Sequence, residues 1–381
     1  MVPRELTPDD YPAVQALHRL AGWPVRSAAG WRWLYDNPAR LEAKAAAGWV
    51  TDGPDGQPAA HVGNLVQRFW LGDQVLYGAT GFSVIVAPGA RGASRVLLEA
   101  FSHQPGMFAT WVFNANRRSQ PLYHRHGMVA WPEQTHALKL SWILSPLPLL
   151  AGRALRAACR IAPHTIAALD EPLLNARLGR TPRVTFPTGV SLLTELTDDS
   201  PFARFWKTLK NEGRLLADRS PAMLRWRLTD PDITIPPLLL AHRRDGAVTG
   251  YAMAQMAKAN SLEPPVLEII DLEALADDSE AIPTLMDGLK LAARAMRAAK
   301  LRLQTVTPQG LSRLGRHANV TRREGGWGHC HVRFAQGAPD PALWSPTPYD
   351  GDYAACLRPL PLQNRSVARR GRVLATVTAR A

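Results

Sequence analysis

The sequence predicts an α+β fold built from two tandem copies of one domain, each a mixed, mostly antiparallel sheet flanked by helices. Three short patterns occur twice in the same order, 190 to 193 residues apart. A constant order and a nearly constant offset indicate an internal duplication. With 381 residues, the chain is also long enough for two domains of ordinary size. The repeated patterns are Glu5-Leu6-Thr7 with Glu195-Leu196-Thr197, Arg32-Trp33 with Arg225-Trp226, and Asp55-Gly56 with Asp245-Gly246.

The first copy is expected to start with a helix and to continue with antiparallel strands. Asp9 or Asp10 is the predicted N-cap of this helix, with Pro12 in its first turn. Periodicity then predicts alternating strands and helices, the order that is typical of an α+β domain. The expected strands are 61–69, 75–86 and 108–113, and the expected helices are 94–101 and 119–126.

The second copy repeats the end of this order. We expect a strand at 266–275, a helix with an apolar stripe from Ile282 to Met296, and a strand at 301–306. The resulting domain boundaries are 1–137 for the first domain, 138–188 for a helical linker, 189–335 for the second domain and 336–381 for an extended basic tail. Residues 363–381 support the tail, because they hold five arginines and no acidic residue.

Charge and composition limit the possible partners. The formal net charge of +13 favours an anionic partner. We expect no nucleic acid, because basic residues do not alternate with aromatic residues and no zinc finger occurs. The three cysteines are far apart and form no CxxC motif, so we expect reduced thiols and no metal.

The polar N-terminus and the short apolar stretches predict a cytoplasmic protein. The longest apolar stretch, 138–152, is interrupted by Lys139, Pro146 and Pro148 and is too short to span a bilayer. Arginines follow this stretch up to residue 160. Three interpretations therefore stay open for 138–160: a packed interdomain helix, a cover for a long acyl chain, or peripheral contact with an anionic membrane.

A possible phosphate site follows the strand that ends near Pro88. The turn Arg91-Gly92-Ala93-Ser94 leads directly into the next predicted helix. Small residues let a phosphate approach the backbone, the first amides of a helix lack intrahelical partners, and Arg91 and Arg95 add positive charge. This pattern indicates a cradle for a pyrophosphate.

Together with a second motif, this turn resembles the GCN5-related N-acetyltransferase (GNAT) superfamily. The first motif, V-x-P-x-x-R-G, is matched from Val86 to Gly92. The second motif, N-x-x-S-x-x-L-Y-x-x-x-G, is matched from Asn116 to Gly127. The two motifs cover residues 84–128, and the order of elements extends the resemblance to residues 5–137.

The resemblance implies N-acyl transfer from acetyl-CoA or another acyl-CoA to an amine, directly and without a covalent enzyme intermediate. The acceptor would be an amine-bearing small molecule or a peptide. Tyr123 would act as general acid for the departing thiolate, because protonation makes CoA a better leaving group. The implied donor-binding residues are Val84, Ile85 and Val86 along the pantetheine arm, Arg91, Gly92, Ala93, Ser94, Arg95 and Val96 around the pyrophosphate, and Asn116 and Ser119 along the cofactor.

The general base is less clear, because the strand 76–86 contains no Asp or Glu. Water, His61 or a group of the second copy are the candidates. In the second copy, Asp271 and Glu273 share one face of the strand by its period of two. That copy has the acidic run 277–280 where a phosphate turn would stand, so we expect it to shape the acceptor site; a purely structural role is the alternative.

Two further alternatives concern the donor and the activity itself. An acyl carrier protein offers the same phosphopantetheine arm on an acidic surface that would suit the net charge of +13. Transfer of a longer acyl chain to a peptide or natural product is a variant of the same reaction. A catalytically silent module that binds acyl-CoA or a protein is a different class, because one fold supports many functions.

Overall fold

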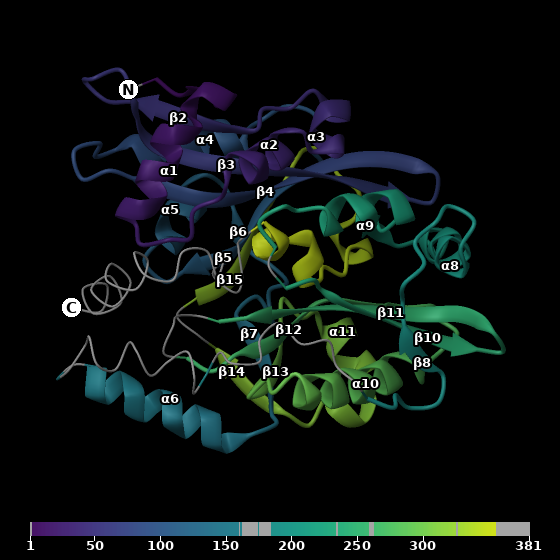
Figure 1. Cartoon of the computed structure of the whole chain (residues 1–381). Helices are drawn as coiled ribbons and strands as arrows, with labels where there is room; N and C mark the ends of the chain where they lie inside the picture. Colours follow the sequence, from purple (N-terminus) through teal and green to yellow (C-terminus); the bar gives the residue numbers. More distant parts are fainter. Residues whose placement is uncertain are drawn as a thin grey trace.

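Two sheets, each built mainly from one half of the chain, lie one above the other with helices on their outer faces (Figure 1). The computed structural model describes residues 2–159, 161, 174, 184–233, 235–258, 263–324 and 327–355. Neighbouring strands are antiparallel except for β4 (Gln74–Val86) with β5 (Ala109–Asn116) and β12 (Val266–Ala274) with β13 (Lys300–Gln304). This arrangement confirms the predicted α+β class with two mixed, mostly antiparallel sheets.

The first half contains the predicted elements in the predicted order. Asp10 is the N-cap of the first helix, and Gly56 occupies the left-handed turn between the second and third strands. The remaining elements are β1 (Arg4–Glu5), α1 (Tyr11–Leu20), α2 (Ala28–Tyr35), α3 (Pro38–Ala43), β2 (Gly48–Asp52), β3 (Pro58–Leu71), α4 (Ala93–Ser102), α5 (Gln120–Arg125) and β6 (Val129–Ala130), followed by β7 (Leu138–Ile143) and α6 (Pro146–Cys159).

The second half repeats this order, as the sequence repeats predict. Its α9 begins after Ser220 and its α11 after Thr307, side chains that each accept a backbone N–H of the first turn. Its other elements are β8 (Val190–Leu192), α8 (Pro201–Lys210), β9 (Leu215–Ala217), α9 (Pro221–Leu228), β10 (Leu238–Arg244), β11 (Ala247–Ala257), α10 (Ala281–Ala295), α11 (Pro308–Arg313), β14 (Thr321–Glu324) and β15 (Trp327–Phe334).

The repeated tryptophans meet where the two halves face each other. Trp33 of α2 and Trp226 of α9 stack with ring centroids 4.4 Å apart. The indole N–H of Trp33 also donates to the carbonyl oxygen of Trp226 at 3.0 Å. Residues that correspond in the two copies therefore contact one another across the interface.

The two halves exchange their last strands. β7 follows the first half in sequence but pairs with β13 and β14 in the second sheet. β15 follows the second half but pairs with β5 and β6 in the first sheet. The helical linker predicted from residue 138 is therefore wrong for its first six residues. They form a strand between β13 and β14, in which Leu140, Ser141 and Trp142 are all buried.

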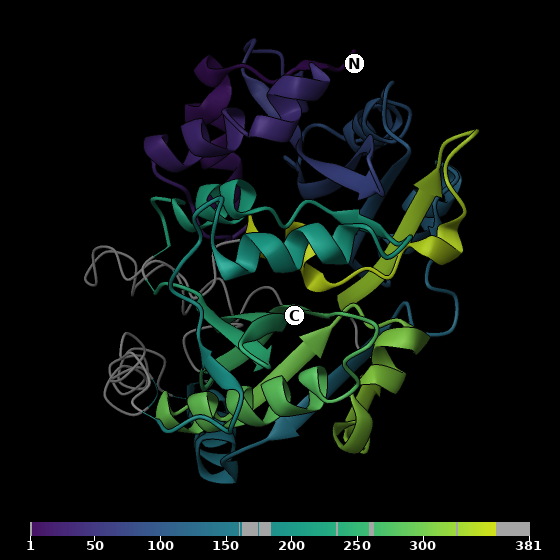
Figure 2. The same ribbon diagram turned by 90° about the vertical axis from the view of Figure 1, so that its right-hand side faces the viewer.

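The chain after β15 returns to the interior between the two sheets, where it appears in yellow in Figures 1 and 2. Trp344, Tyr349 and Tyr353 are each at most 2% exposed and belong to one hydrophobic core with residues of both sheets. The extended tail predicted from residue 336 is therefore wrong for residues 338–355, because their aromatic side chains are buried. The arginine-rich run 363–381 lies outside the described residues.

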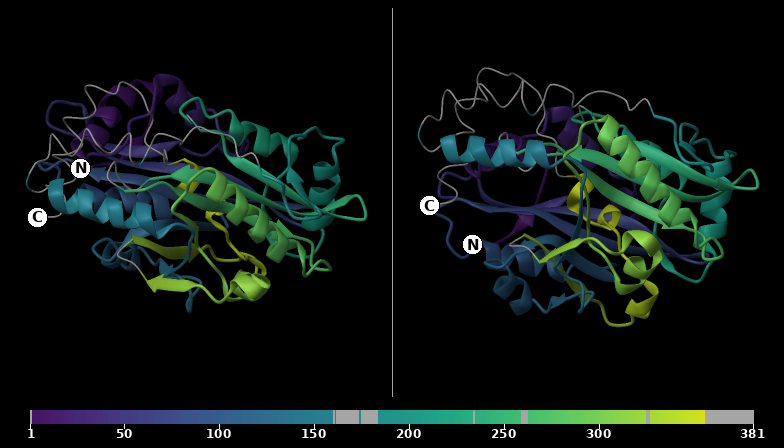
Figure 3. Two further views of the ribbon diagram at one scale, coloured as in Figure 1. Left: turned by 60° about the horizontal axis from the view of Figure 1, so that its bottom comes forward. Right: turned by 90° about the horizontal axis from the view of Figure 1, so that it is seen from below.

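Helices lie on the outer faces of both sheets, and the right-hand view of Figure 3 shows α10, in light green, across the strands of the second sheet. α4 packs on β2, β3 and β4 of the first sheet, and α10 packs on β10, β11 and β12 of the second. In the described part of the chain, no helix combines the length and the apolar character needed to cross a membrane. α6 begins at Pro146 and forms a separate arm, with Leu147 and Leu150 exposed.

Candidate functional site

β4 and β5 separate at the place where the first copy was predicted to bind its donor. Their pairing runs from Gly78 with Ala109 to Thr80 with Trp111. Beyond these pairs, β4 continues to Val86 beside β3, and β5 continues beside β15. We call the diverging ends, residues 81–86 and 112–116, the splay. No ladder joins its two inner edges; the Phe113 carbonyl there accepts a hydrogen bond from the Tyr353 hydroxyl at 3.3 Å.

A bulge in β4 shapes one edge of the splay. The register between β3 and β4 shifts between His61 and Gly63, and Ser83 has a positive φ of 51°. The His61 ring nitrogen Nδ1 lies 3.1 Å from the Ser83 carbonyl oxygen. A bulge adds a residue to one strand and turns its backbone locally. His61 therefore stabilises the bulge just before Val84, the first residue of the predicted pantetheine strand.

The predicted phosphate turn follows directly and is open to solvent. Arg91, Gly92 and Arg95 are exposed, whereas Ala93 and Leu97 of α4 are fully buried against the sheet. Gly92 has a φ of 90° and no atom within 4 Å of an added Cβ. The backbone of this turn is therefore accessible, and the buried face of α4 keeps it in place.

Not every predicted amide of this turn is free. The amide of Ala93 donates to the Ala90 carbonyl, and that of Arg95 donates to Gly92. Ser94 and Val96 are half-buried at the start of α4. A pyrophosphate at this turn would meet two exposed arginine side chains and the remaining backbone.

Asn116 and Ser119 close the turn between β5 and α5. The Asn116 side-chain oxygen accepts the amides of Arg118 and Ser119 at 2.9 and 3.0 Å. The Ser119 hydroxyl contacts both the amide and the carbonyl of Asn116 at 3.0 Å. These reciprocal bonds give the motif residues a structural role, since they set the direction in which α5 leaves the sheet.

Tyr123 lies on α5, 7% exposed, in the core cluster that includes α4. Burial raises the pKa of its phenol to about 12, and the Ser119 hydroxyl opposes this shift. The phenol is therefore protonated across the neutral pH range, as a general acid must be.

The exchanged strand β15 brings His331 to Tyr123. Their ring centroids are 6.0 Å apart. His331 is 1% exposed, and within the described part of the chain its Nδ1 has no hydrogen-bond partner. Burial, together with the nearby rings of His124 and His136, lowers the pKa of His331 to about 4. An uncharged imidazole from the second half therefore lies beside the candidate acid of the first half.

The three candidate side-chain bases are all buried. His61 is fully buried among the rings of His18, Trp31 and Phe82, and burial lowers its pKa to about 3. An imidazole enclosed in this way supports the bulge of β4. It could contact an acceptor amine only if the surrounding rings moved away.

Asp271 and Glu273 do share one face of β12, as predicted, but both are paired. Asp271 is fully buried, accepts hydrogen bonds from Arg219 at 2.7 and 3.1 Å, and also contacts the Tyr251 hydroxyl. Glu273 accepts a hydrogen bond from Arg214 at 2.7 Å. Their carboxylates therefore serve in the interior charge network that includes Asp350, 3.3 Å from Arg219.

The second copy lacks the phosphate turn, because the acidic run 277–280 stands in its place. Asp278 lies just before α10, and its carboxylate accepts the amides of Glu280 and Ala281 at 3.3 and 3.2 Å. A carboxylate of the chain thus occupies the place where a bound phosphate would stand.

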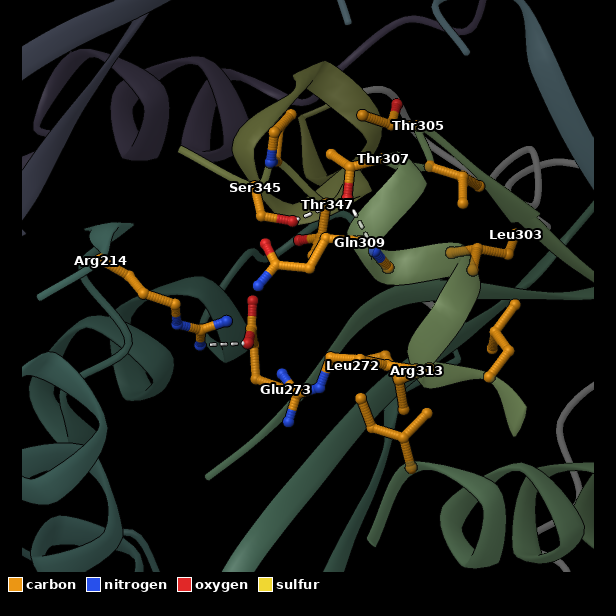
Figure 4. Close-up of a pocket in the computed structure, with 15 residues that line it drawn as sticks. Arg214, Leu272, Glu273, Leu303, Thr305, Thr307, Gln309, Arg313, Ser345 and Thr347 are labelled. Carbon is orange, nitrogen blue, oxygen red and sulfur yellow. Dashed lines mark hydrogen bonds and ion pairs between the residues drawn. The ribbon is translucent and has the colours of Figure 1, made fainter. Parts of the chain in front are cut away.

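A small pocket nevertheless occupies the corresponding splay of the second copy (Figure 4). β12 and β13 pair from Val266 with Lys300 to Ile269 with Leu303 and then diverge. The pocket lies between their ends and α11, with a volume of about 40 Å³. Glu273, one of the candidate bases, lines this pocket. Figure 4 shows its carboxylate hydrogen-bonded to Arg214.

Sequence reasoning did not find His331 or the arginines of this pocket. His331 lies 208 residues after Tyr123 and reaches it only through the strand exchange. The alternation of His329 and His331 in the run 327–334 marks one face of a strand. That signal shows a shared face but does not show which sheet the strand joins.

The fold is GNAT-like: strands of each sheet diverge at one parallel pair, and a helix follows the first strand of that pair. No protein-family model matches the sequence, and no curated protein matches it. Among solved structures, the Saccharomyces cerevisiae N-myristoyltransferase with bound myristoyl-CoA has 9% identity and a TM-score of 0.52, covering 92% of this chain and 84% of its own.

Two further solved structures are similar over most of the chain. A GCN5-related N-acetyltransferase from Kribbella flavida has 14% identity and a TM-score of 0.49. The match covers 87% of this chain and 71% of the Kribbella chain. A probable N-acyltransferase from Enterococcus faecalis has 11% identity and a TM-score of 0.46, with 87% and 72% covered.

Proposed function

We propose that the chain is an N-acyltransferase that moves an acetyl or other acyl group from acyl-CoA to an amine. The observation that supports this proposal most is the continuous path in the first copy. On β4, the start of the splay at residue 81, the bulge at Ser83 and the exposed Arg91–Gly92 turn follow one another within twelve residues of sequence. An extended thioester arm ending in a pyrophosphate needs an edge of free backbone followed by a positively charged turn.

The reaction is written as a direct transfer. The neutral amine attacks the thioester carbonyl carbon, the C–N bond forms and the C–S bond breaks. The Tyr123 phenol gives its proton to the departing sulfur. The proton lost by the amine passes to solvent, because the candidate carboxylates are paired, and the Tyr123 phenolate takes a proton back from solvent. Metal ions have no part in this scheme. Residues 84–86 would hold the arm, and Arg91 and Arg95 would neutralise the pyrophosphate.

The donor site is tested by thermal unfolding with free CoA, acetyl-CoA, octanoyl-CoA and palmitoyl-CoA. A ligand that binds only the folded chain stabilises it by about 2.7 kcal/mol at a hundred times its Kd. We expect at least one of the four to raise the melting temperature by several degrees. If none does, a CoA donor is excluded, and phosphopantetheine on an acyl carrier protein becomes the donor to test.

Activity is tested separately from binding. Release of free CoA thiol is followed with acetyl-CoA and a panel of primary amines, and the product is identified by its mass. Amine-dependent thiol release supports the transferase. Binding of acyl-CoA without release under any amine would favour the silent module. The order of stabilisation among the acyl-CoAs indicates the length of the acyl chain.

A further inference from the structure

The second copy keeps a pocket although its phosphate turn is blocked. The pocket lies where the ends of β12 and β13 diverge, so it corresponds in position to the splay of the first copy. Residues 345–347 from the chain after β15 line it as well. A volume of about 40 Å³ suits a small polar group and excludes a nucleotide or a pantetheine arm.

Arg313 is the group of this pocket with unused hydrogen-bonding capacity. In the described structure its hydrogen bonds run from Nη2 alone, to the carbonyl oxygens of Ala274 at 2.8 Å and Leu275 at 3.1 Å. It forms no ion pair with a described carboxylate. Burial lowers the pKa of Arg313, because the guanidinium is partly desolvated without a directly bonded counter-charge. A guanidinium in this state is stabilised by an anion that accepts a hydrogen bond from one of its remaining N–H groups, Nε or Nη1.

The surrounding charges limit which anion fits. Glu273 already accepts a hydrogen bond from Arg214 at 2.7 Å, and Figure 4 shows these two side chains on the same side of the pocket as Arg313. Glu212 and Asp278 also act on Arg313 through their charge. A doubly charged phosphate would be repelled by these carboxylates, whereas a singly charged group meets less repulsion. Because Nη2 already donates to two carbonyl oxygens, one oxygen of a carboxylate would accept from Nη1 or Nε.

The rest of the lining is uncharged and mixed: Leu272, Ile282, Leu303, Val306, Leu314 and Pro346 are apolar, and five side chains carry a hydroxyl or an amide. Thr307 and Ser345 bond each other at 2.8 Å, and Gln309 is exposed at the start of α11. Thr305 and Thr347 also line the pocket, although the Thr347 hydroxyl donates to Asp271 at 2.7 Å and that of Thr305 contacts the Cys330 sulfur. Such a lining can accept or donate hydrogen bonds to a hydroxyl or amide next to the bound carboxylate.

We propose that this pocket binds the carboxylate of a small organic molecule, with Arg313 as the residue that recognises it. The site goes beyond the proposed acyl transfer, because binding here requires neither a donor nor catalysis. Its carboxylate can come from the amine acceptor itself or from a separate effector, and the two sources share the same contact with Arg313.

The test measures binding of acetate and L-lactate to the full chain by ligand-observed NMR, each against its neutral amide. We expect each carboxylate to bind at least about tenfold more tightly than its amide, which corresponds to about 1.4 kcal/mol. Arg313→Gln removes the charge and should weaken carboxylate binding at least tenfold. The matched control is Arg316→Gln, since Arg316 is an exposed arginine nearby that pairs with Glu280 and Asp287 at the surface.

A second variant keeps the test decisive if Arg313→Gln does not fold. Gln309→Glu changes an exposed position and adds a negative charge to the pocket. It should weaken carboxylate binding and leave the binding of the amides unchanged. Equal binding of acid and amide, or carboxylate binding that survives both pocket variants, would overturn the proposal, as would the lack of any carboxylate binding to the unmodified chain.

Kinetics separate the two sources of the carboxylate. 4-Aminobutyrate and n-butylamine are compared as acceptors, because they differ only in the acid group. If the acceptor supplies the carboxylate, Arg313→Gln raises KM for 4-aminobutyrate alone. If an effector supplies it, both amines react alike and L-lactate changes the rate with either of them. Failure of all acyl transfer would count against the proposed function, while the binding result still decides the carboxylate site.

Discussion

At the residue scale, Tyr123 is the proposed proton donor for the departing thiolate. Burial raises the pKa of its phenol to about 12, so the acid form persists through neutral pH. Tyr123→Phe should therefore lower kcat at least about tenfold and leave the Kd for acyl-CoA nearly unchanged, a range typical of a lost proton donor. The kcat of the unmodified chain should show no fall between pH 8 and 10 from this group.

The matched control for this substitution is Tyr77→Phe, which removes a hydroxyl from β4 that bonds to Glu42 at 3.2 Å. Steady-state kinetics and isothermal titration with acyl-CoA separate the two effects. If Tyr123→Phe keeps full turnover, the phenol is only a core residue of α5 and the acid must be another group.

Buried histidines make a second prediction at this scale, for stability against pH. Burial lowers the pKa of His61 to about 3 and that of His331 to about 4, from 6.5. Below pH 6.5 the unfolded chain takes up protons at both rings while the folded chain does not, so stability is lost as the pH falls. Burial raises the pKa of Asp350 to about 6. Below that pH the folded chain binds a proton at Asp350 before the unfolded chain does, which increases stability as the pH falls.

Between pH 6 and pH 4 the two histidines each lower stability by the equivalent of one proton, and Asp350 offsets one of them. The free energy of unfolding should therefore fall by about 1.4 kcal/mol for each pH unit of acidification. The lowered pKa values of His18 and His317 act in the same direction as this slope. His61→Asn keeps a side-chain donor for the Ser83 carbonyl but has no group that titrates. It should reduce the pH dependence of the free energy of unfolding by the equivalent of about one proton. Urea unfolding from pH 4.5 to 8 measures this, with exposed His103→Asn as control; an unchanged slope would show that His61 does not contribute.

At the element scale, the turn between β4 and α4 should bind a pyrophosphate through charge. Arg91→Gln and Arg95→Gln should each weaken CoA binding about three- to tenfold, in the range of an exposed charge-assisted contact. Neither change should alter the binding of pantetheine, which lacks the pyrophosphate. Exposed Arg153 on α6 gives the control substitution Arg153→Gln. Equal losses for CoA and pantetheine would contradict a phosphate role for this turn.

Elements with local sequence signals were predictable. Helix α4 follows from the apolar face that contains Leu97 and Phe101, and the turn before α5 follows from the short-range bonds of Asn116 and Ser119. The splay itself was not predicted; the resemblance implied only that residues 84–86 run along the pantetheine arm. Its physical cause is the bulge at Ser83, and the buried contact with His61 that stabilises it joins two strands 22 residues apart. Periodicity within one strand contains no information on such a contact.

At the scale of the whole molecule, the duplication was predictable but the exchange of strands was not. Repeats show that two similar units exist, whereas the partner of an edge strand depends on packing that forms only in the folded chain. β15 carries buried Cys330 and Val332, which suit an inner strand of either sheet. The same limit applies to Trp344 and Tyr349, because an aromatic residue in a proline-rich run does not reveal which core it fills.

The exchange predicts that neither half folds alone. β15 lies between β5 and β6 in the first sheet, so a fragment of residues 1–161 lacks an inner strand and exposes the backbone edge of β5. This fragment should aggregate or unfold without a cooperative transition, measured by size exclusion and thermal circular dichroism. Co-expression with residues 184–381 should restore a soluble complex with the unfolding transition of the intact chain. A soluble fragment 1–161 with its own cooperative transition would show that the first sheet does not need β15.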